Sequence, residues 1–155
     1  MRLALYQPDI AQNVGTILRL GACLGVGVDI IEPCGFPFGD ASLKRAGLDY
    51  IDHASFLRHE SWAAYLASKP ARIVLLTTKA DRPYTDFAFR STDALLFGRE
   101  TAGVPHEVSD RADARLKIPL QPHMRSLNVA VAAGMVLGEA LRQTDQFPAV
   151  ESARP

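Results

Sequence analysis

Residues 94–105 read Ala-Leu-Leu-Phe-Gly-Arg-Glu-Thr-Ala-Gly-Val-Pro, an apolar run that passes directly into a glycine-rich polar turn. Four consecutive apolar residues are typical of a strand buried on both faces of a sheet, because a half-exposed strand alternates apolar and polar residues. Residues 73–76, Ile-Val-Leu-Leu, form a second run of this kind. The two runs predict the centre of a parallel sheet.

Strand-like and helix-like stretches alternate on both sides of these runs. The expected strands are 3–6, 28–31, 50–54, 73–77, 94–97 and 116–118. The expected helices are 13–25, a short one near 42–46, 60–67, a short one near 106–110, and a long final one from about 126 to 142. This order predicts an α/β domain with a mainly parallel sheet and helices on both faces.

A chain of 155 residues fits one domain, which we place at 1–147, followed by a frayed tail at 148–155. Its 48% hydrophobic and 22% charged residues are typical of a soluble globular protein, and no apolar stretch reaches transmembrane length. The N-terminus has no long apolar segment before Pro8 and is expected to form a strand, not a signal peptide. We therefore expect a cytoplasmic protein without a membrane partner.

Charge and cysteine content limit the possible partners. Cys23 and Cys34 show no CxxC spacing and the four histidines are scattered, so we expect two plain thiols and no metal site. Seventeen basic residues balance 17 acidic ones, so any RNA binding requires a local basic patch. Thirteen of the basic residues are arginine, which favours bidentate phosphate contacts slightly.

The common nucleotide-binding and hydrolase motifs are absent from the sequence. In Gly25-Val-Gly-Val28 the glycines precede a strand and Ile30 occupies the third glycine position, so a Rossmann fingerprint is not indicated. There is no P-loop, Gly-x-Ser-x-Gly or His-Glu-x-x-His. Because ligands of open α/β sheets bind outside the carboxyl ends of the strands, we expect the functional residues in the segments after Tyr6, Thr77, Gly98 and Ile118.

The segment from Pro8 to Arg19 offers a cation on a helix. Asn13 can cap the helix start, and Gly15, Arg19 and Ala22 fall on one face. Small neighbours leave room around the guanidinium, so Arg19 is a candidate active-site cation. The alternative is an ordinary surface arginine.

The segments after the two later strands offer backbone and polar groups. Gly98 lets a ligand approach the backbone, and Glu100 either is a solvated loop acid or organises the loop and the adjacent Arg99. In the segment 118–134, Ser126 or Asn128 can cap the final helix and leave backbone N–H donors for ligand oxygens.

The final helix is unusually apolar. From Val129 to Gly138 it has no polar side chain. This segment is too short to span a bilayer and too apolar for the surface of a monomer. Ala130, Gly134 and Gly138 recur at i+4 and would let a second helix approach, so we expect a twofold homodimer through this helix. Full burial within the monomer is the alternative.

Three motifs together carry a family resemblance: Asn13-x-Gly15-x-x-x-Arg19, then 97–105 (Phe-Gly-Arg-Glu-Thr-Ala-Gly-Val-Pro), then Ile118-Pro-Leu with 125–128 (Arg-Ser-Leu-Asn). Their order and spacing resemble the SPOUT methyltransferases across nearly the whole chain. With 31–33 (Ile-Glu-Pro) and 45–50 (Arg-Ala-Gly-Leu-Asp-Tyr) between them, the chain is most similar to the TrmL-type enzymes that methylate the wobble ribose of tRNA.

The resemblance implies a deep C-terminal trefoil knot, a rare exception among folds. It also implies S-adenosylmethionine as the cofactor and, as the reaction, transfer of its methyl group to the ribose 2′-hydroxyl of the wobble nucleotide (C or U) in the tRNA anticodon stem-loop, with leucine isoacceptors as expected substrates. The residues that the resemblance places around the cofactor are Leu76, Thr77, Gly98, Glu100, Ile118, Ser126 and Leu127.

For the chemistry, the resemblance places the residue matching Arg19 on the hydroxyl. An arginine stays protonated, so we interpret Arg19 as a stabiliser of the developing alkoxide and a clamp on RNA phosphate, with an RNA phosphate oxygen or water as proton acceptor. Asn13, Ser126 and Asn128 would orient the reacting groups. No metal is required.

Substrate and partner contacts leave alternatives. Lys44 and Arg45 are candidate phosphate contacts, or else part of a solvated charged face. Ribosomal RNA is an alternative substrate, although relatives that modify it carry an added RNA-binding domain, and a non-catalytic RNA-binding module is an alternative function. Val131 and the pair Gly138-Glu139 depart from the Asn and the Tyr-Glu pair usual in close relatives, which puts the dimer contact in doubt.

Overall fold

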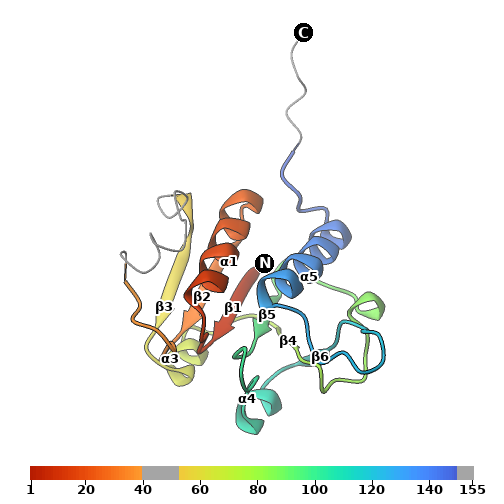
Figure 1. The fold of residues 1–155 in the computed structure, drawn as a ribbon. Helices are drawn as coiled ribbons and strands as arrows, with labels where there is room; N and C mark the ends of the chain where they lie inside the picture. Colours follow the sequence, from red (N-terminus) through yellow and green to blue (C-terminus); the bar gives the residue numbers. More distant parts are fainter. Residues whose placement is uncertain (40–52, 150–155) are drawn as a thin grey trace.

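The computed structural model describes residues 1–39 and 53–149. In this part of the chain, six strands form one sheet of order β3-β2-β1-β5-β4-β6 (Figure 1). The strands are β1 (Arg2–Tyr6), β2 (Gly27–Ile31), β3 (Phe56–His59), β4 (Ile73–Leu76), β5 (Ala94–Phe97) and β6 (Ala114–Leu116). All neighbouring strands pair in parallel, which confirms the predicted α/β class.

Helices cover both faces of the sheet. They are α1 (Ala11–Leu24), α3 (Trp62–Ala67), the 3-10 helix η2 (Tyr84–Asp86), α4 (His106–Asp110) and α5 (Val129–Thr144). Helices α1 and α5 lie side by side (Figure 1) and pack through a cluster that includes Ile17 and Leu137. Tyr65 of α3 and Val108 of α4 belong to a second cluster on the opposite face.

The alternation of side chains along β1 shows why the strands are apolar throughout. Leu3 and Leu5 belong to the cluster under α1 and α5, whereas Ala4 and Tyr6 belong to the cluster under α3 and α4. Successive side chains of a strand point to opposite faces, so a strand covered on both sides needs an apolar residue at every position. Fully burying one leucine contributes about 1.5–3 kcal/mol.

Four of the six predicted strands are confirmed within one residue at each end, whereas the strand expected at 116–118 is displaced, because β6 runs from Ala114 to Leu116. Strand β5 pairs with β1 at the centre of the sheet, but β4 lies between β5 and the edge strand β6. The strand expected at 50–54 is wrong for the residues that can be compared, because the chain enters β3 only at Phe56. Leu57 and Arg58 of this edge strand are exposed, so it lacks the apolar pattern that revealed β4 and β5. The short helix expected near 42–46 lies outside the described residues.

The two long helices begin differently from one another. Helix α1 starts at Ala11 with Ile10 at the N-cap and no side-chain cap, so the prediction that Asn13 caps it is wrong. Helix α5 starts at Val129, and Asn128 caps it by accepting hydrogen bonds from the backbone of Ala130 and Val131. Of the two caps considered, Asn128 is the one used, and it occupies donors that were expected to be available to a ligand.

None of the described helices is both long and apolar enough to cross a membrane. The trefoil knot stays a prediction, because strand order and register do not specify which segment passes through which loop.

Candidate active site

The carboxyl ends of β1, β5 and β6 are each followed by a segment that was singled out in the sequence. Residues 7–13 follow β1, residues 98–103 follow β5, and residues 117–128 follow β6. Strand register aligns Leu5 and Leu76 with Phe97, and the Thr77 amide donates to the Leu116 carbonyl at 2.9 Å. The segments that were singled out in the sequence therefore lie together at the carboxyl ends of the strands, as predicted.

A chain of side-chain hydrogen bonds links these three segments. The Asn13 amide donates to Oε1 of Glu100 at 3.0 Å, and the Asn128 amide donates to Oδ1 of Asn13 at 2.9 Å. The second carboxylate oxygen of Glu100 accepts from the backbone N–H of Asp9 at 2.8 Å. Asn13 is only 8% exposed, which explains why its amide is used for long-range contacts and not for capping α1. Glu100 thus organises the loop, one of the two roles considered for it.

Asp9 forms a second set of contacts that sequence reasoning missed. Its carboxylate accepts from Nη2 of Arg99 at 2.6 Å and from the Thr101 hydroxyl at 2.7 Å. The hydrogen bond from Arg99, followed by that from Thr101, lowers the pKa of Asp9 below its ordinary value. The adjacent arginine expected to pair with Glu100 pairs with Asp9 instead. The only available signal was the position of Asp9 just after a buried strand.

Gly98 has a structural reason to be glycine. A Cβ at this position would lie 2.6 Å from the carbonyl carbon of Gly103, because residues 98–103 fold back on themselves. The two Arg99–Gly103 backbone hydrogen bonds, 3.0 and 2.8 Å long, close this turn. The prediction that another group comes close to the backbone of Gly98 is confirmed, but that group is Gly103 of the same chain and not a ligand.

The residues expected around the cofactor lie at neighbouring strand ends. Leu76 and Thr77 follow one another at the end of β4, Gly98 follows β5, and Ile118 lies two residues beyond β6. These four are half-buried, whereas Ser126 and Leu127 are exposed in the segment before α5. The structure thus gathers the first four, and the other two belong to a neighbouring exposed loop.

The loop 118–128 has many unused backbone donors. Its one backbone–backbone contact as a donor is Met124 N–H to the Gln121 carbonyl at 3.1 Å. The backbone N–H groups of Ile118, Leu120, Arg125, Ser126 and Leu127 have no partner among the described residues. Donors beside half-buried and exposed apolar side chains suit a ligand with an apolar ring and hydroxyl or carboxylate oxygens.

Arg19 lies farther along α1 than Asn13. Arg19 is exposed on α1, six residues and about 9 Å of helix rise beyond Asn13. Lys44 and Arg45, expected to contact phosphate, lie outside the described residues. A small pocket lined by Asn13, Gly98 and Glu100, among others, holds about 10 Å³ and is far too small for a cofactor. A ligand therefore has to use the open loop side.

Metal and thiol chemistry find little support in the described residues. Over 1–39 and 53–149, no group of three or more His, Cys, Asp and Glu side chains is arranged to hold a metal ion. Both cysteines are free thiols. Burial is the largest cause that raises the pKa of Cys34 to about 11, so this thiol stays protonated at neutral pH.

Comparison with known proteins gives the site a context. A model of the SpoU rRNA Methylase family matches residues 1–138. The tRNA (cytidine(34)-2'-O)-methyltransferase of Beijerinckia indica subsp. indica is 60% identical over 154 residues, covering 97% of this chain and 96% of that protein.

The chain is also similar to solved structures of RNA methyltransferases. One that concerns the 2-OH methylation of C/U34 on tRNA is 43% identical, with a TM-score of 0.86 over 92% of this chain and 94% of that chain. An AdoMet-bound rRNA methyltransferase from Sinorhizobium meliloti is 27% identical, with a TM-score of 0.80 over 91% of this chain and 55% of that one.

Proposed function

The chain belongs to the SpoU rRNA methylase family, and from this premise we propose that it methylates the ribose 2′-hydroxyl of the wobble nucleotide, C or U, of tRNA. One observation carries the proposal: the relative from Beijerinckia indica, 60% identical over almost the full length of both chains, is named for methyl transfer to cytidine 34 of tRNA. The corresponding identity to the rRNA methyltransferase from Sinorhizobium meliloti is 27%, which favours tRNA over ribosomal RNA. A tRNA substrate also agrees with the cytoplasmic location expected from the sequence.

S-adenosylmethionine is the proposed cofactor. The loop 118–128 offers unused backbone donors beside Leu127, which is 38% exposed, and next to the half-buried Leu76 and Ile118. An adenine ring needs apolar contact, and its ribose and amino-acid ends need hydrogen bonds, so these groups fit the molecule. When bound, it supplies a methyl group on a sulfonium. Leu76, Thr77, Ile118 and Leu127 would hold it.

The hydrogen-bonded chain Glu100–Asn13–Asn128 has a positioning role in this proposal. It joins α1, the loop after β5 and the start of α5 through contacts of 2.8–3.0 Å. Methyl transfer needs the acceptor oxygen in line with the methyl group, and an error of about 1 Å in placement can cost on the order of a hundredfold in rate. Neither Asn13 nor Glu100 needs to touch the substrate to affect turnover.

Arg19 is proposed to act on charge. In methyl transfer the 2′-oxygen would take the methyl group as the methyl–sulfur bond breaks, and its proton would pass to an RNA phosphate oxygen or water. A guanidinium nearby would stabilise the negative charge that develops on the oxygen. Arg19 is exposed on α1, where RNA can reach it. Its planar group can also hold an RNA phosphate through two hydrogen bonds.

The test of this role is single-turnover methyl transfer to unmodified tRNA by Arg19→Ala and Arg19→Lys, with cofactor binding measured separately. We expect Arg19→Ala to lose on the order of a hundred- to a thousandfold in rate at unchanged cofactor affinity, and Arg19→Lys to recover little. A near wild-type rate for Arg19→Ala would make the arginine structural. Loss of cofactor binding would place it in the cofactor site.

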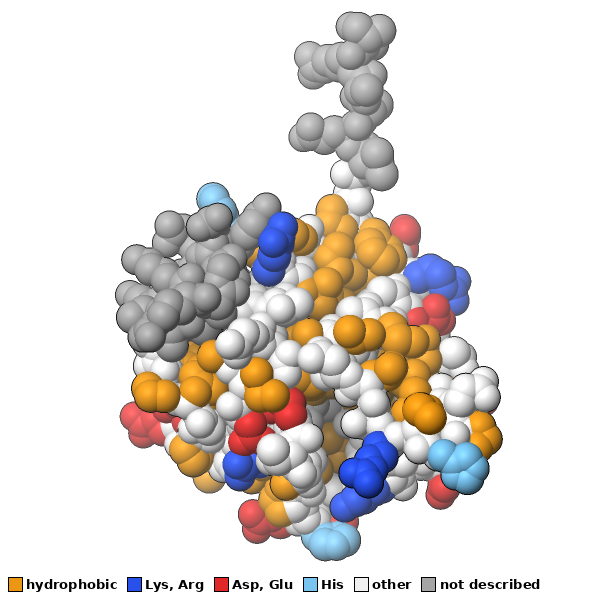
Figure 2. Space-filling model, viewed as in Figure 1, with side chains coloured by type: hydrophobic (Ala, Val, Ile, Leu, Met, Phe, Trp, Pro, Cys, Tyr) orange, Lys and Arg blue, Asp and Glu red, His pale blue; other side chains and the backbone are white. Residues whose placement is uncertain are grey.

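The exposed face of α5 supports the proposed homodimer. Ala133, Leu137 and Ala140 are buried against the monomer, which leaves the opposite side of the helix uncovered. There, Val131 is 52% and Met135 40% exposed, and Figure 2 shows hydrophobic side chains gathered over α5. A Cβ added at Gly134 or Gly138 would meet no atom within 4 Å. Over residues 1–39 and 53–149, the chain therefore covers only one side of this helix.

A self-complementary contact between two copies of the chain would cover this face. It would not need the Asn and Tyr that close relatives usually have at the positions of Val131 and Gly138. We expect a dimer by light scattering at micromolar concentration, and a weakened or insoluble species for Gly134→Arg, whose side chain would enter open space in the monomer. A monomeric wild-type protein would contradict the proposal.

A further inference from the structure

An open hollow of about 560 Å³ lies at the amino ends of the strands, whereas the candidate active site lies at their carboxyl ends. Its lining includes Lys69, Arg72, Arg90, Arg111 and Asp113, which lie in the segments that lead into β4, β5 and β6. These strands are three or four residues long, so about 10–13 Å of strand separates the hollow from the carboxyl ends. The hollow is thus distinct from the site described above.

Positive charge is concentrated in this hollow. Four cationic side chains face one lining carboxylate, that of Asp113, although the whole chain has 17 basic and 17 acidic residues. The side chains of Lys69, Arg90 and Arg111 make no hydrogen bond or ion pair with the described part of the chain, and all three residues are exposed. Asp113 can offset one of these three charges, and the remaining excess of positive charge is available to an anion.

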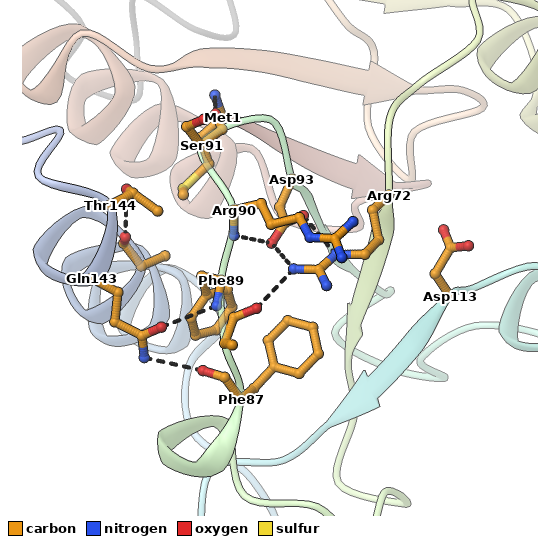
Figure 3. A network of polar contacts seen from close by, with 12 residues as sticks. Met1, Arg72, Phe87, Phe89, Arg90, Ser91, Asp93, Asp113, Gln143 and Thr144 are labelled. Carbon is orange, nitrogen blue, oxygen red and sulfur yellow. Dashed lines mark hydrogen bonds and ion pairs between the residues drawn. The ribbon is translucent and has the colours of Figure 1, made fainter.

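Arg72 is fixed in the wall of the hollow. Its Nε and Nη2 donate to the two carboxylate oxygens of Asp93 at 2.8 and 2.7 Å, and Nη2 also donates to the Ala88 carbonyl at 2.9 Å (Figure 3). The guanidinium carbon lies 4.6 Å from the centre of the Phe87 ring. These contacts hold the guanidinium in one orientation and leave Nη1 without a hydrogen bond among the described residues.

The segment that carries Arg90 is also held in place. Its backbone N–H donates to Asp93 at 2.8 Å, and the Gln143 side chain of α5 bonds the backbone of Phe89 at 3.0 Å and Phe87 at 3.1 Å (Figure 3). Only the side chain of Arg90 is then left to be ordered when an anion binds. A prearranged cation loses less conformational entropy on binding than one on a mobile loop.

We propose that this hollow binds a backbone phosphate of the tRNA substrate, an inference that rests on the tRNA methyltransferase function proposed above. Guanidinium groups suit phosphate because their donors match two of its oxygens. A site for a small phosphorylated molecule would be enclosed and mainly apolar. This one is open and polar and offers no aromatic side chain for a base, which is typical of contacts that position RNA without reading its sequence.

The test compares the double variant Arg90→Ala/Arg111→Ala with Arg115→Ala. Arg115 is an exposed arginine of β6 outside the hollow, paired with the exposed Asp110 at 3.5 Å, so it controls for a general loss of positive charge. The dissociation constant for tRNA is measured by fluorescence anisotropy at several salt concentrations. Arg72 is left intact because its removal would strand the buried Asp93 carboxylate.

For the double variant we expect on the order of tenfold weaker tRNA binding and a salt dependence lower by about one unit in the slope of log K against log salt. Arg115→Ala should bind as the wild type does. Cofactor affinity and the rate at saturating tRNA should not change in either variant, because both sites lie away from the carboxyl ends of the strands.

Equal affinity and equal salt slope in the double variant and the wild type would overturn the inference. So would loss of inorganic phosphate binding in the double variant at unchanged tRNA affinity, because the hollow would then serve free phosphate. Failure of the proposed function gives a different result: the wild-type protein itself would not methylate tRNA.

Discussion

Asn128 has two separable roles, which makes its replacement a sharp test of the site. It caps α5 through the backbone N–H groups of Ala130 and Val131, at 2.8 and 3.3 Å, and it donates to Asn13 at 2.9 Å. Asn128→Ala removes both roles. Loss of an N-cap typically costs about 1 kcal/mol.

The second contribution comes from Asn13, whose Oδ1 atom would lose its donor. A buried unsatisfied acceptor costs about 1–3 kcal/mol. We take the lower end, because Asn128 is itself exposed and its removal would admit water to Asn13. The two effects sum to about 2 kcal/mol, which corresponds to a fall in Tm of about 4–8 °C for a chain of this length.

Differential scanning calorimetry at fixed protein concentration measures this change. Asn128→Ser is the matched control, because a serine can cap the helix but cannot reach Asn13, so its Tm should lie between those of the wild type and Asn128→Ala. If Asn128→Ala melts within about 1 °C of the wild type, the reasoning about both contacts is refuted. If the serine and alanine variants melt together, the cap contributes nothing.

Three further predictions concern other groups. Asp93→Ala should lower the free energy of unfolding by about 3–5 kcal/mol in urea titrations, because Asp93 is fully buried and Arg72 would lose its partner; a change below about 1 kcal/mol would contradict this. The lowered pKa of Asp9 means that its contact with Arg99 stabilises the fold at pH values above the ordinary carboxyl pKa, and that this stabilisation is lost as the pH falls through the folded pKa. Asp9→Asn should therefore make the free energy of unfolding depend less on pH below about pH 4. The Cys34 thiol, with a pKa of about 11, should react with iodoacetamide at pH 8 more slowly than the exposed cysteine, as followed by mass spectrometry; equal rates would contradict its burial.

The elements that sequence reasoning predicted are those whose pattern is local. Four consecutive apolar residues marked β4 and β5, and two possible cap residues before an apolar run, Ser126 and Asn128, marked the start of α5 to within about three residues. The edge strand β3 was misplaced because Leu57 and Arg58 are exposed, so its sequence resembles that of a loop.

The parts that could not be predicted depend on contacts between distant residues. Asn13 was expected to cap its own helix, but its partners lie 87 and 115 residues away, a distance at which no local pattern operates. The pairing of Asp9 with Arg99 spans 90 residues for the same reason. Gly98 was correctly singled out as a point of close approach, yet only the folded turn shows that Gly103 occupies that space.

The most direct test of the proposed function is to map 2′-O-methylated nucleotides in total tRNA from cells with and without this gene. The account predicts that methylation at nucleotide 34 disappears without the gene, first of all in the leucine isoacceptors, and returns with the wild-type gene but not with Arg19→Ala. Unchanged methylation at nucleotide 34 in the deletion strain would contradict it.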